Sequence, residues 1–182
     1  MVSNAVQTPA KETHVRWNAL YPGELERERE RERETYHQAL GETHMTSLEH
    51  AISIATSAHA GHLADDKEPY IFHPLRVMLA LDTEDERIVG VLHDVVEKTA
   101  LTLDSLRSEG LPGHILDAIV SVSRRQGEDY FDFVGRTREN SLGRRVKIAD
   151  LKDNIEKVKS HLEDPKAREK LAKYEEALAR LS

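Results

Sequence analysis

The apolar positions of the chain recur at helical spacing from Met45 onward. Ser47 is suited to cap a first helix, and the apolar stripe of that helix consists of Leu48, Ala51, Ile52, Ala55 and Ala58. The same period, with matching start and stop residues, predicts further helices over residues 74–79, 84–99, 101–109, 112–125, 130–139, 142–159 and from 165 onward. No segment of the sequence alternates strictly enough to predict a strand. The pattern therefore predicts an all-α bundle.

Residues 1–44 differ from the rest because they carry few apolar residues. They include a strict alternation of Glu and Arg from Glu26 to Glu34, in which attractive and repulsive helical pairs largely cancel. Both residue types favour a helix, but the segment has no face to bury. We therefore divide the chain into a charged N-terminal extension, 1–44, disordered or helical, and a domain, 45–182. Two alternatives are a partner-binding arm and a natural start at Met45.

Composition narrows the class of protein. The absence of Cys excludes thiolate ligands, a cysteine nucleophile and disulfides, and no apolar run is long enough to span a membrane. We expect a soluble, cytoplasmic protein without membrane contact. The net charge of −7 argues against general nucleic-acid binding, which needs a basic face. It still allows a small phosphorylated substrate, because a metal and a few Lys or Arg can reverse the field inside one cleft.

One helix contains a polar pair that its surroundings do not explain. His93 and Asp94 interrupt the apolar run 88–97, where an unpaired carboxylate would cost several kcal/mol. Adjacent side chains leave a helix about 100° apart and can converge on an ion beside it. Glu97 lies one turn further on the same face, where a carboxylate beside a metal suits the handling of a proton.

Two distant residues need the same explanation. His73 ends an apolar stretch before Pro74, and Asp150 falls on the apolar stripe of its own helix. Taken alone, His73 is more often a core or capping residue, and Asp150 could pair with Arg144 or Lys147. One divalent metal bound by His73, His93, Asp94 and Asp150 would neutralise the whole set. Mixed nitrogen and carboxylate ligands suit Mn²⁺, Fe²⁺, Zn²⁺ or Mg²⁺, and the nitrogen ligands disfavour a purely Mg²⁺ site.

Other polar residues remain ambiguous. Asn154, one turn after Asp150, could hydrogen-bond a sugar or phosphate or be an ordinary surface amide. Arg124, Arg125 and the loop that ends at Tyr130 could meet phosphates, or the two arginines could cap their helix. The pair His59 and His62 is more simply a helix-end histidine and a loop residue than a second metal site.

Four motifs occur in an order that resembles a known family. They are Ala58-His59, Glu68-Pro-Tyr-Ile-Phe-His-Pro-Leu-Arg-Val77, Leu92-His-Asp-Val-Val-Glu-Lys-Thr99 and Val146-Lys-Ile-Ala-Asp-Leu-Lys-Asp-Asn154. Over roughly residues 46–154 the chain resembles the hydrolase domain of the RelA/SpoT proteins and its small stand-alone forms. These belong to the HD-domain metal-dependent phosphohydrolases. The resemblance implies an HD-domain helical bundle with its metal site between helices.

The resemblance also implies roles for individual residues. A single Mn²⁺ would be held by the four residues His73, His93, Asp94 and Asp150. Glu97 would be the general acid/base, and Asn154 would contact the substrate. The family removes the 3′-pyrophosphate of (p)ppGpp, which leaves GDP or GTP.

The chain departs from the family at two places. Lys98 stands where the family has a second catalytic acid. Ala64 and Asp65 replace an Arg-Lys pair that packs on guanine and meets phosphate, so Arg124, Arg125 and Lys147 are the candidates for replacing those phosphate contacts.

The preferred interpretation is a Mn²⁺-dependent phosphohydrolase that acts on a nucleotide carrying a 3′-pyrophosphate or 3′-phosphate. Within enzymes, NADPH and a pyrophosphorylated tRNA end are alternative substrates. A different class is a non-catalytic nucleotide-sensing or antitoxin-like module, which Lys98 favours. Homo-oligomerisation is compatible with the sequence.

Overall fold

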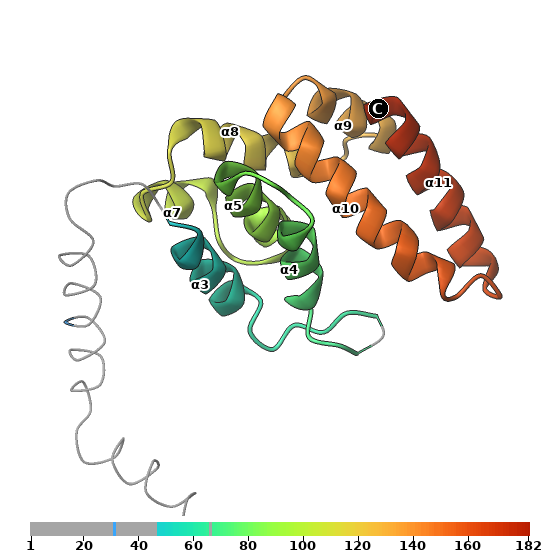
Figure 1. Cartoon of the computed structure of the whole chain (residues 1–182), viewed down its shortest axis with the longest axis horizontal. Helices are drawn as coiled ribbons and strands as arrows, with labels where there is room; N and C mark the ends of the chain where they lie inside the picture. Colours follow the sequence, from blue (N-terminus) through green and yellow to red (C-terminus); the bar gives the residue numbers. More distant parts are fainter. Residues whose placement is uncertain (1–30, 32–46, 66) are drawn as a thin grey trace, which may run out of the picture. The chain divides into compact units, whose positions relative to one another are not determined.

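The computed structural model describes residue 31 and residues 47–65 and 67–182 (Figure 1). Over residues 47–65 and 67–182, one helix follows another, as the apolar periodicity predicted. The helices are α3 (Leu48–Ala58), α4 (Phe72–Leu79), α5 (Glu84–Leu92), α6 (Val95–Lys98), α7 (Leu103–Ser108), α8 (Gly113–Val122), α9 (Tyr130–Arg138), α10 (Ser141–Lys159) and α11 (Pro165–Leu181). Within the described residues, the β pairing consists of an isolated antiparallel bridge between Leu63 and Pro69. The all-α prediction is confirmed.

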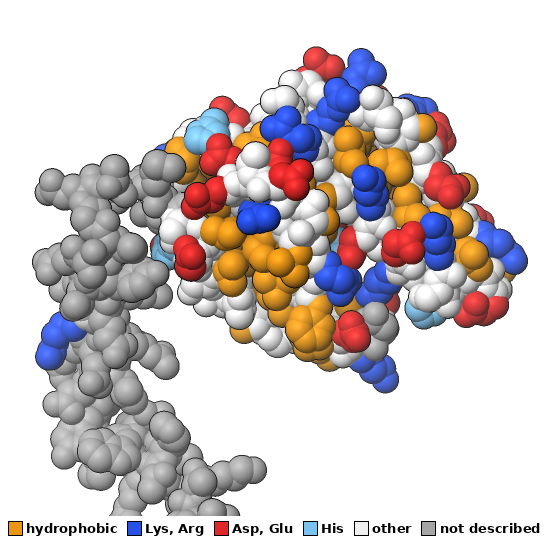
Figure 2. All heavy atoms as spheres, in the orientation of Figure 1, with side chains coloured by type: hydrophobic (Ala, Val, Ile, Leu, Met, Phe, Trp, Pro, Cys, Tyr) orange, Lys and Arg blue, Asp and Glu red, His pale blue; other side chains and the backbone are white. Residues whose placement is uncertain are grey.

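The predicted charged extension, 1–44, lies outside the described residues apart from Arg31, so the domain boundary at residue 45 stays a prediction. Within the described part of the chain, no helix combines the length and the apolar character that a bilayer span requires. Acidic and basic side chains are interspersed over the face of the domain that Figure 2 shows.

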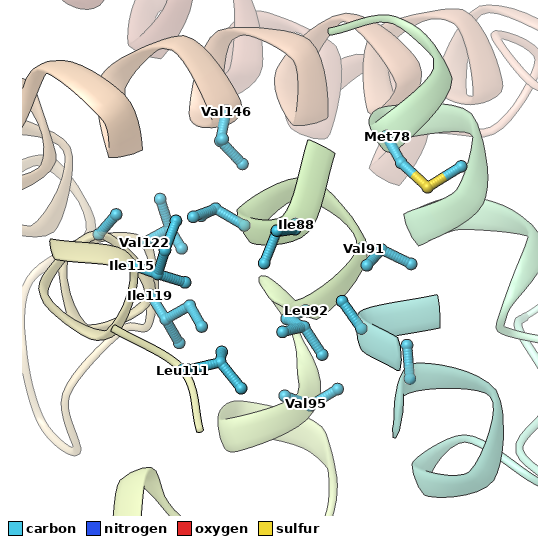
Figure 3. Close-up of a cluster of buried hydrophobic side chains, with 14 of the residues drawn as sticks. Met78, Ile88, Val91, Leu92, Val95, Leu111, Ile115, Ile119, Val122 and Val146 are labelled. Carbon is cyan, nitrogen blue, oxygen red and sulfur yellow. The ribbon is translucent and has the colours of Figure 1, made fainter. Parts of the chain in front are cut away.

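Helix α5 is the centre of the larger hydrophobic core. It packs against α3, α4, α8 and α10, and Ile88, Val91 and Leu92 are buried there. Figure 3 shows Ile88 and Leu92 on the side of α5 toward Ile115 and Ile119 of α8, and Val91 on the side toward Met78 of α4. At Gly90 an added Cβ would lie 2.7 Å from the Leu81 side chain and 3.3 Å from the Met78 backbone, so glycine permits the close approach of α4 and α5. This packing fixes the end of α5, where the His-Asp pair lies.

The predicted helix over 84–99 is wrong in one respect, because the structure divides it at the His-Asp pair. Helix α5 ends at Leu92 and α6 begins at Val95. In a continuous helix the Gly90 carbonyl accepts the amide hydrogen of residue 94. Here the imidazole Nδ1 of His93 lies 2.8 Å from that carbonyl oxygen and competes for it. The side chain of a predicted metal ligand thus also interrupts the helix. Helix α4 also begins earlier than predicted, at Phe72, which places Pro74 inside its first turn.

A second, smaller cluster lies between α9, α10 and α11. Its buried members are Phe133, Val134, Leu151, Ala177 and Leu181. Helix α11 lies along α10 in Figure 1 and packs on it closely. Helix α10 contributes Val146 and Ala149 to the first cluster and Leu151 to the second, and the buried Asp150 lies among these residues in the sequence.

The loop between α8 and α9 is built around Glu128. Arg136 donates from Nε to Oε1 at 2.8 Å and from a terminal nitrogen to Oε2 at 2.9 Å. The same guanidinium donates to carbonyls at the end of α8, including those of Val120 and Ser123. Chiefly through these hydrogen bonds, Arg136 lowers the pKa of Glu128 from 4.5 to about 2.

We expect Glu128→Gln to lower the free energy of unfolding by about 2 kcal/mol, because the charge-assisted fork is lost from a side chain that is only 13% exposed. In a domain of this size that corresponds to a fall in Tm of roughly 4–8 °C. A group with a depressed pKa stabilises the fold above its ordinary pKa and loses that effect as pH falls through its folded value. The difference between wild type and variant should therefore be full above pH 4.5 and vanish near pH 2. Thermal melts over pH 2–7, with Glu139→Gln as an exposed control, measure it.

Candidate metal centre and active site

Three helices bring the four predicted metal ligands to one point. His73 lies in the first turn of α4, His93 and Asp94 lie at the break between α5 and α6, and Asp150 lies in the middle of α10. These helices pack against one another in pairs, so residues far apart in sequence become neighbours. His93 and Asp150 are buried, and the side chains of His73 and Asp94 are 12% and 13% exposed.

The distances between their polar atoms suit a bound cation. His73 Nε2 lies 3.2 Å from Asp150 Oδ1, and His93 Nε2 lies 3.3 Å from Asp94 Oδ2. The two crossed pairs, His73 with Asp94 and His93 with Asp150, are each separated by 3.8 Å. Atoms about 2.1 Å from one metal ion lie roughly 3–3.5 Å apart. One ligand atom each from His73, His93 and Asp94 lies within 4.8 Å of the others, and Asp150 reaches both imidazoles from the opposite helix.

The hydrogen bonds of the two imidazoles leave the Nε2 atoms for a ligand. His93 Nδ1 donates to the Gly90 carbonyl oxygen, and its Nε2 is buried with no hydrogen-bond partner among the described residues. His73 Nδ1 lies 2.7 Å from Asp153 Oδ2 and donates to it, so its Nε2 lone pair faces Asp150. Two acceptors in contact repel each other unless a proton or a cation lies between them. This donor set therefore fits a divalent metal.

The carboxylates are held in the charged form that metal binding needs. Burial raises the pKa of Asp94, but the neighbouring His93 outweighs burial and the pKa lies well below its ordinary value. Burial likewise raises the pKa of Asp150, and the opposing charge of Lys147 lowers it well below the usual range. Burial lowers the pKa of His73, but the carboxylates of Asp150 and Asp153 that face its two nitrogens raise it to about 9. A proton on His73 and a bound cation are thus alternatives for the same negative cluster.

Two of the predicted substrate residues, Lys147 and Asn154, contact Asp150. Lys147 Nζ lies 2.7 Å from Asp150 Oδ2, and the Lys147 side chain is 13% exposed. Asn154 donates from Nδ2 to Asp150 Oδ1 at 2.5 Å and to the Asp150 carbonyl at 3.0 Å. Both residues therefore contact a predicted metal ligand.

The other predicted substrate residues lie along the loop between α8 and α9. The exposed Arg124 donates from its guanidinium to the Glu128 carbonyl, at 2.9 and 2.6 Å, and the Arg125 amide donates to Glu128 Oε2. Tyr130 packs in the smaller cluster, with Lys173 Nζ 3.8 Å from its ring centroid. Its hydroxyl is buried and has no hydrogen-bond partner within the described part of the chain.

Glu97 and Lys98 lie on the exposed side of α6. Glu97 Oε2 accepts the backbone amide of Arg124 at 3.0 Å, which links α6 to the loop after α8. Lys98 Nζ lies 5.4 Å from the ring centroid of Tyr70. The Tyr70 hydroxyl donates a short hydrogen bond to Asp94. The positive charge of Lys98 is therefore held close to the predicted metal ligands.

Sequence reasoning missed two contributors to this site. Tyr70 was quoted within a motif but was given no role, although it hydrogen-bonds Asp94. Asp153 was also unassigned, although it lies three residues after Asp150 and so on the same helix face. That spacing was the signal that could have identified it. Among the described residues, the pair His59 and His62 does not complete a three-ligand group of its own; their rings lie 5.7 Å apart.

The segment that replaces the family's Arg-Lys pair forms a tight loop. The Ala64 amide donates to the Glu68 carbonyl at 2.9 Å, and Lys67 adopts a positive φ of 66°. Asp65 is exposed and lies 3.8 Å from Lys170 of α11.

Comparisons with known proteins agree with this geometry. No family model matches the chain. The chain is 32% identical over 87 residues to a probable GTP pyrophosphokinase from Mycobacterium leprae (strain TN), covering 44% of this chain and 11% of that protein. It is 26% identical over 139 residues to a GTP pyrophosphokinase from Myxococcus xanthus, covering 66% and 18%. It is also 26% identical over 141 residues to a guanosine-3′,5′-bis(diphosphate) 3′-pyrophosphohydrolase from Aquifex aeolicus (strain VF5), covering 71% and 20%. The chain thus spans a fifth or less of the length of these relatives.

A solved structure shows the same fold. It is described as a metazoan ortholog of SpoT that hydrolyses ppGpp, and it superposes with a TM-score of 0.61 at 16% identity, covering 74% of this chain and 84% of its own. The two proteins share a helical fold, and in this chain that fold brings His73, His93, Asp94 and Asp150 together. The relatives and the structural neighbour are of the RelA/SpoT type, and the resemblance predicted from the four motifs is confirmed.

Proposed function

We propose that the chain is a metal-dependent phosphohydrolase that removes a 3′-pyrophosphate, or a 3′-phosphate, from a nucleotide such as (p)ppGpp, with Mn²⁺ as the metal. The observation that carries this proposal is the cluster of His73, His93, Asp94 and Asp150, in which a buried Nε2 lacks a hydrogen-bond partner among the described residues. The Aquifex relative, named as a 3′-pyrophosphohydrolase of the same kind of nucleotide, supports the substrate class.

The reaction requires a water to attack phosphorus while the bond to the 3′-oxygen breaks and that oxygen takes up a proton. A divalent cation in the cluster would supply positive charge to the phosphate oxygens and acidity to a water. Glu97 is the group that would move the proton. Its Oε2 accepts the Arg124 amide, which fixes the carboxylate and leaves Oε1 as the oxygen that takes the proton of the attacking water. Asp94 and Asp150 would stay ionised throughout, because their pKa values are depressed.

The substrate contacts are proposed from the surroundings of the metal ligands. Asn154 and Lys147 adjoin Asp150, so their remaining hydrogen-bonding capacity is within reach of a phosphate group placed at the cluster. Arg124 and Arg125 lie on the loop that Glu97 contacts. Tyr130 follows this loop, and its hydroxyl has no hydrogen-bond partner among the described residues. Binding of a phosphate at this loop would require the Arg124 guanidinium to leave the Glu128 carbonyl.

The test is an assay of the purified full-length chain with ppGpp and Mn²⁺, in which pyrophosphate and GDP are quantified separately. We expect stoichiometric release of both and no release after the metal is removed with a chelator. NADPH and pyrophosphorylated tRNA are run in parallel. Turnover of one of these alone would reassign the substrate. Binding of ppGpp without turnover of any substrate would favour the nucleotide-sensing or antitoxin-like alternative.

Lys98 leads to a prediction about rate and selectivity. Its charge lies beside Tyr70 and Asp94, at the position where the resemblance implies a second catalytic acid. We therefore expect Lys98→Asp to raise turnover of ppGpp several-fold. Lys166→Asp on the exposed start of α11 makes the same charge change and should leave turnover unaltered.

Base selectivity is measured in the same kinetic experiment. Neither Ala64 nor Asp65 has a guanidinium group that could stack on the base. We therefore expect ppGpp and ppApp to be hydrolysed at similar rates. A strong preference for ppGpp with a low micromolar KM would show that guanine is read by other residues.

A further inference from the structure

Both nitrogens of one predicted ligand, His73, are faced by carboxylates from the same helix. Asp150 Oδ1 lies 3.2 Å from His73 Nε2, and Asp153 Oδ2 lies 2.7 Å from His73 Nδ1. Residues three apart share one face of a helix, so α10 offers both carboxylates to α4. A single imidazole is thus held between a predicted metal ligand and a second acid that does not reach the metal cluster through its own oxygens.

The second acid is itself fixed by an arginine from the helix that carries the histidine. Arg76 donates from Nε to Asp153 Oδ1 at 2.6 Å and from a terminal nitrogen to Asp153 Oδ2 at 3.0 Å. Such a two-pronged contact sets the plane of the carboxylate as well as its position. Asp153 is 15% exposed at its side chain, whereas Arg76 is 45% exposed. The acid is therefore largely enclosed between α4 and α10.

We infer that Asp153 is a positioning residue of the metal centre, which acts through His73, and that Arg76 holds it in place. The inference rests on the metal site of the proposed function. Asp153 accepts a hydrogen bond from the protonated Nδ1 of His73. This bond selects the tautomer that has its lone pair on Nε2, and it holds the ring with that lone pair toward the cluster. A carboxylate in this position also makes the ligand nitrogen more basic, and loss of such a partner typically weakens metal binding by about 10–100-fold.

A purely structural role would give different measurements. If Asp153 served only to join α4 to α10 through Arg76, its loss would lower the Tm of the metal-free chain and leave metal affinity unchanged. The two roles therefore separate in affinity and in the protonation pattern of one imidazole, and neither readout requires hydrolysis.

The experiment compares wild type with Asp153→Asn and Asp153→Ala in the full-length chain. Titration calorimetry with Mn²⁺ and with Zn²⁺ gives the dissociation constants, and melts give the metal-free Tm. The asparagine keeps one acceptor oxygen without its charge, and the alanine keeps neither. We expect the dissociation constant to rise about 10-fold for the first and up to about 100-fold for the second. Asp104→Asn, an exposed residue paired with Arg107, is the matched control and should bind metal as wild type does.

Nitrogen NMR of the Zn²⁺-loaded wild type tests the tautomer without any variant. We expect the His73 ring to carry its proton on Nδ1. A proton on Nε2 in the wild type, or dissociation constants within threefold of wild type in both variants, would overturn the inference. Metal binding without hydrolysis would overturn only the proposed activity, and a wild type that binds neither metal would overturn both.

Discussion

Replacing Asp94 by alanine is expected to remove the metal and to reduce hydrolysis by about 10³-fold or more, since a metal contributes several kcal/mol to the stabilisation of a phosphoryl transition state. Asp94 Oδ2 lies 3.3 Å from His93 Nε2 and 3.8 Å from His73 Nε2, so it places a carboxylate oxygen close to both imidazoles. Its removal leaves two imidazoles with one carboxylate between them. It also deprives the Tyr70 hydroxyl of its acceptor.

Metal content per chain, measured by elemental analysis after dialysis, and pyrophosphate release from ppGpp are the two readouts for Asp94→Ala. Asp104→Ala controls for loss of an aspartate from the surface. A full metal load in Asp94→Ala would remove this residue from the ligand set, whatever the activity.

Changing Glu97 to glutamine should lower turnover by about 10²-fold or more and leave metal content and substrate KM close to wild type. The amide keeps the shape of the side chain and an oxygen that can accept the Arg124 amide, but it cannot take a proton. Glu97 is exposed and is joined to the loop after α8, so the substitution has little effect on packing.

The comparison for Glu97→Gln is Glu109→Gln, an acidic residue at the end of α7 that is remote in the sequence from the four motifs. Single-turnover rates and metal analysis are measured on both proteins. Loss of metal together with activity would make Glu97 a ligand, and unchanged turnover would place the proton transfer on another group.

The fold was predictable from the sequence because most of its helices have both a helical spacing of apolar residues and a residue that marks a helix end. Ser47 caps α3 through its hydroxyl, and Pro165 begins α11, both as predicted. The break at the His-Asp pair was not predictable from periodicity. It depends on the imidazole of His93 competing for the Gly90 carbonyl, which is a side-chain contact that an apolar pattern does not encode.

The ligand set could be predicted as a group because burial of unpaired charge is costly wherever it occurs. The surroundings of that set could not be predicted. Lys147 was a candidate both for a substrate contact and for pairing with Asp150, and the structure shows the pair with Asp150. Asp153 was given no role, because its contacts with His73 and Arg76 depend on the packing of α4 against α10. Contacts between helices therefore account for most of what the sequence left open.

Helix α10 lies between two apolar clusters, and its one buried acid faces histidines from α4 and from the end of α5. A cation bound there would act as a reversible cross-link between segments that are distant along the chain. Its binding free energy would then contribute to the stability of the fold, by about 2.7 kcal/mol at a hundredfold excess over Kd. The lifetime of the folded chain would thus depend on the concentration of free metal, and chains deprived of metal would be the first to unfold and be degraded.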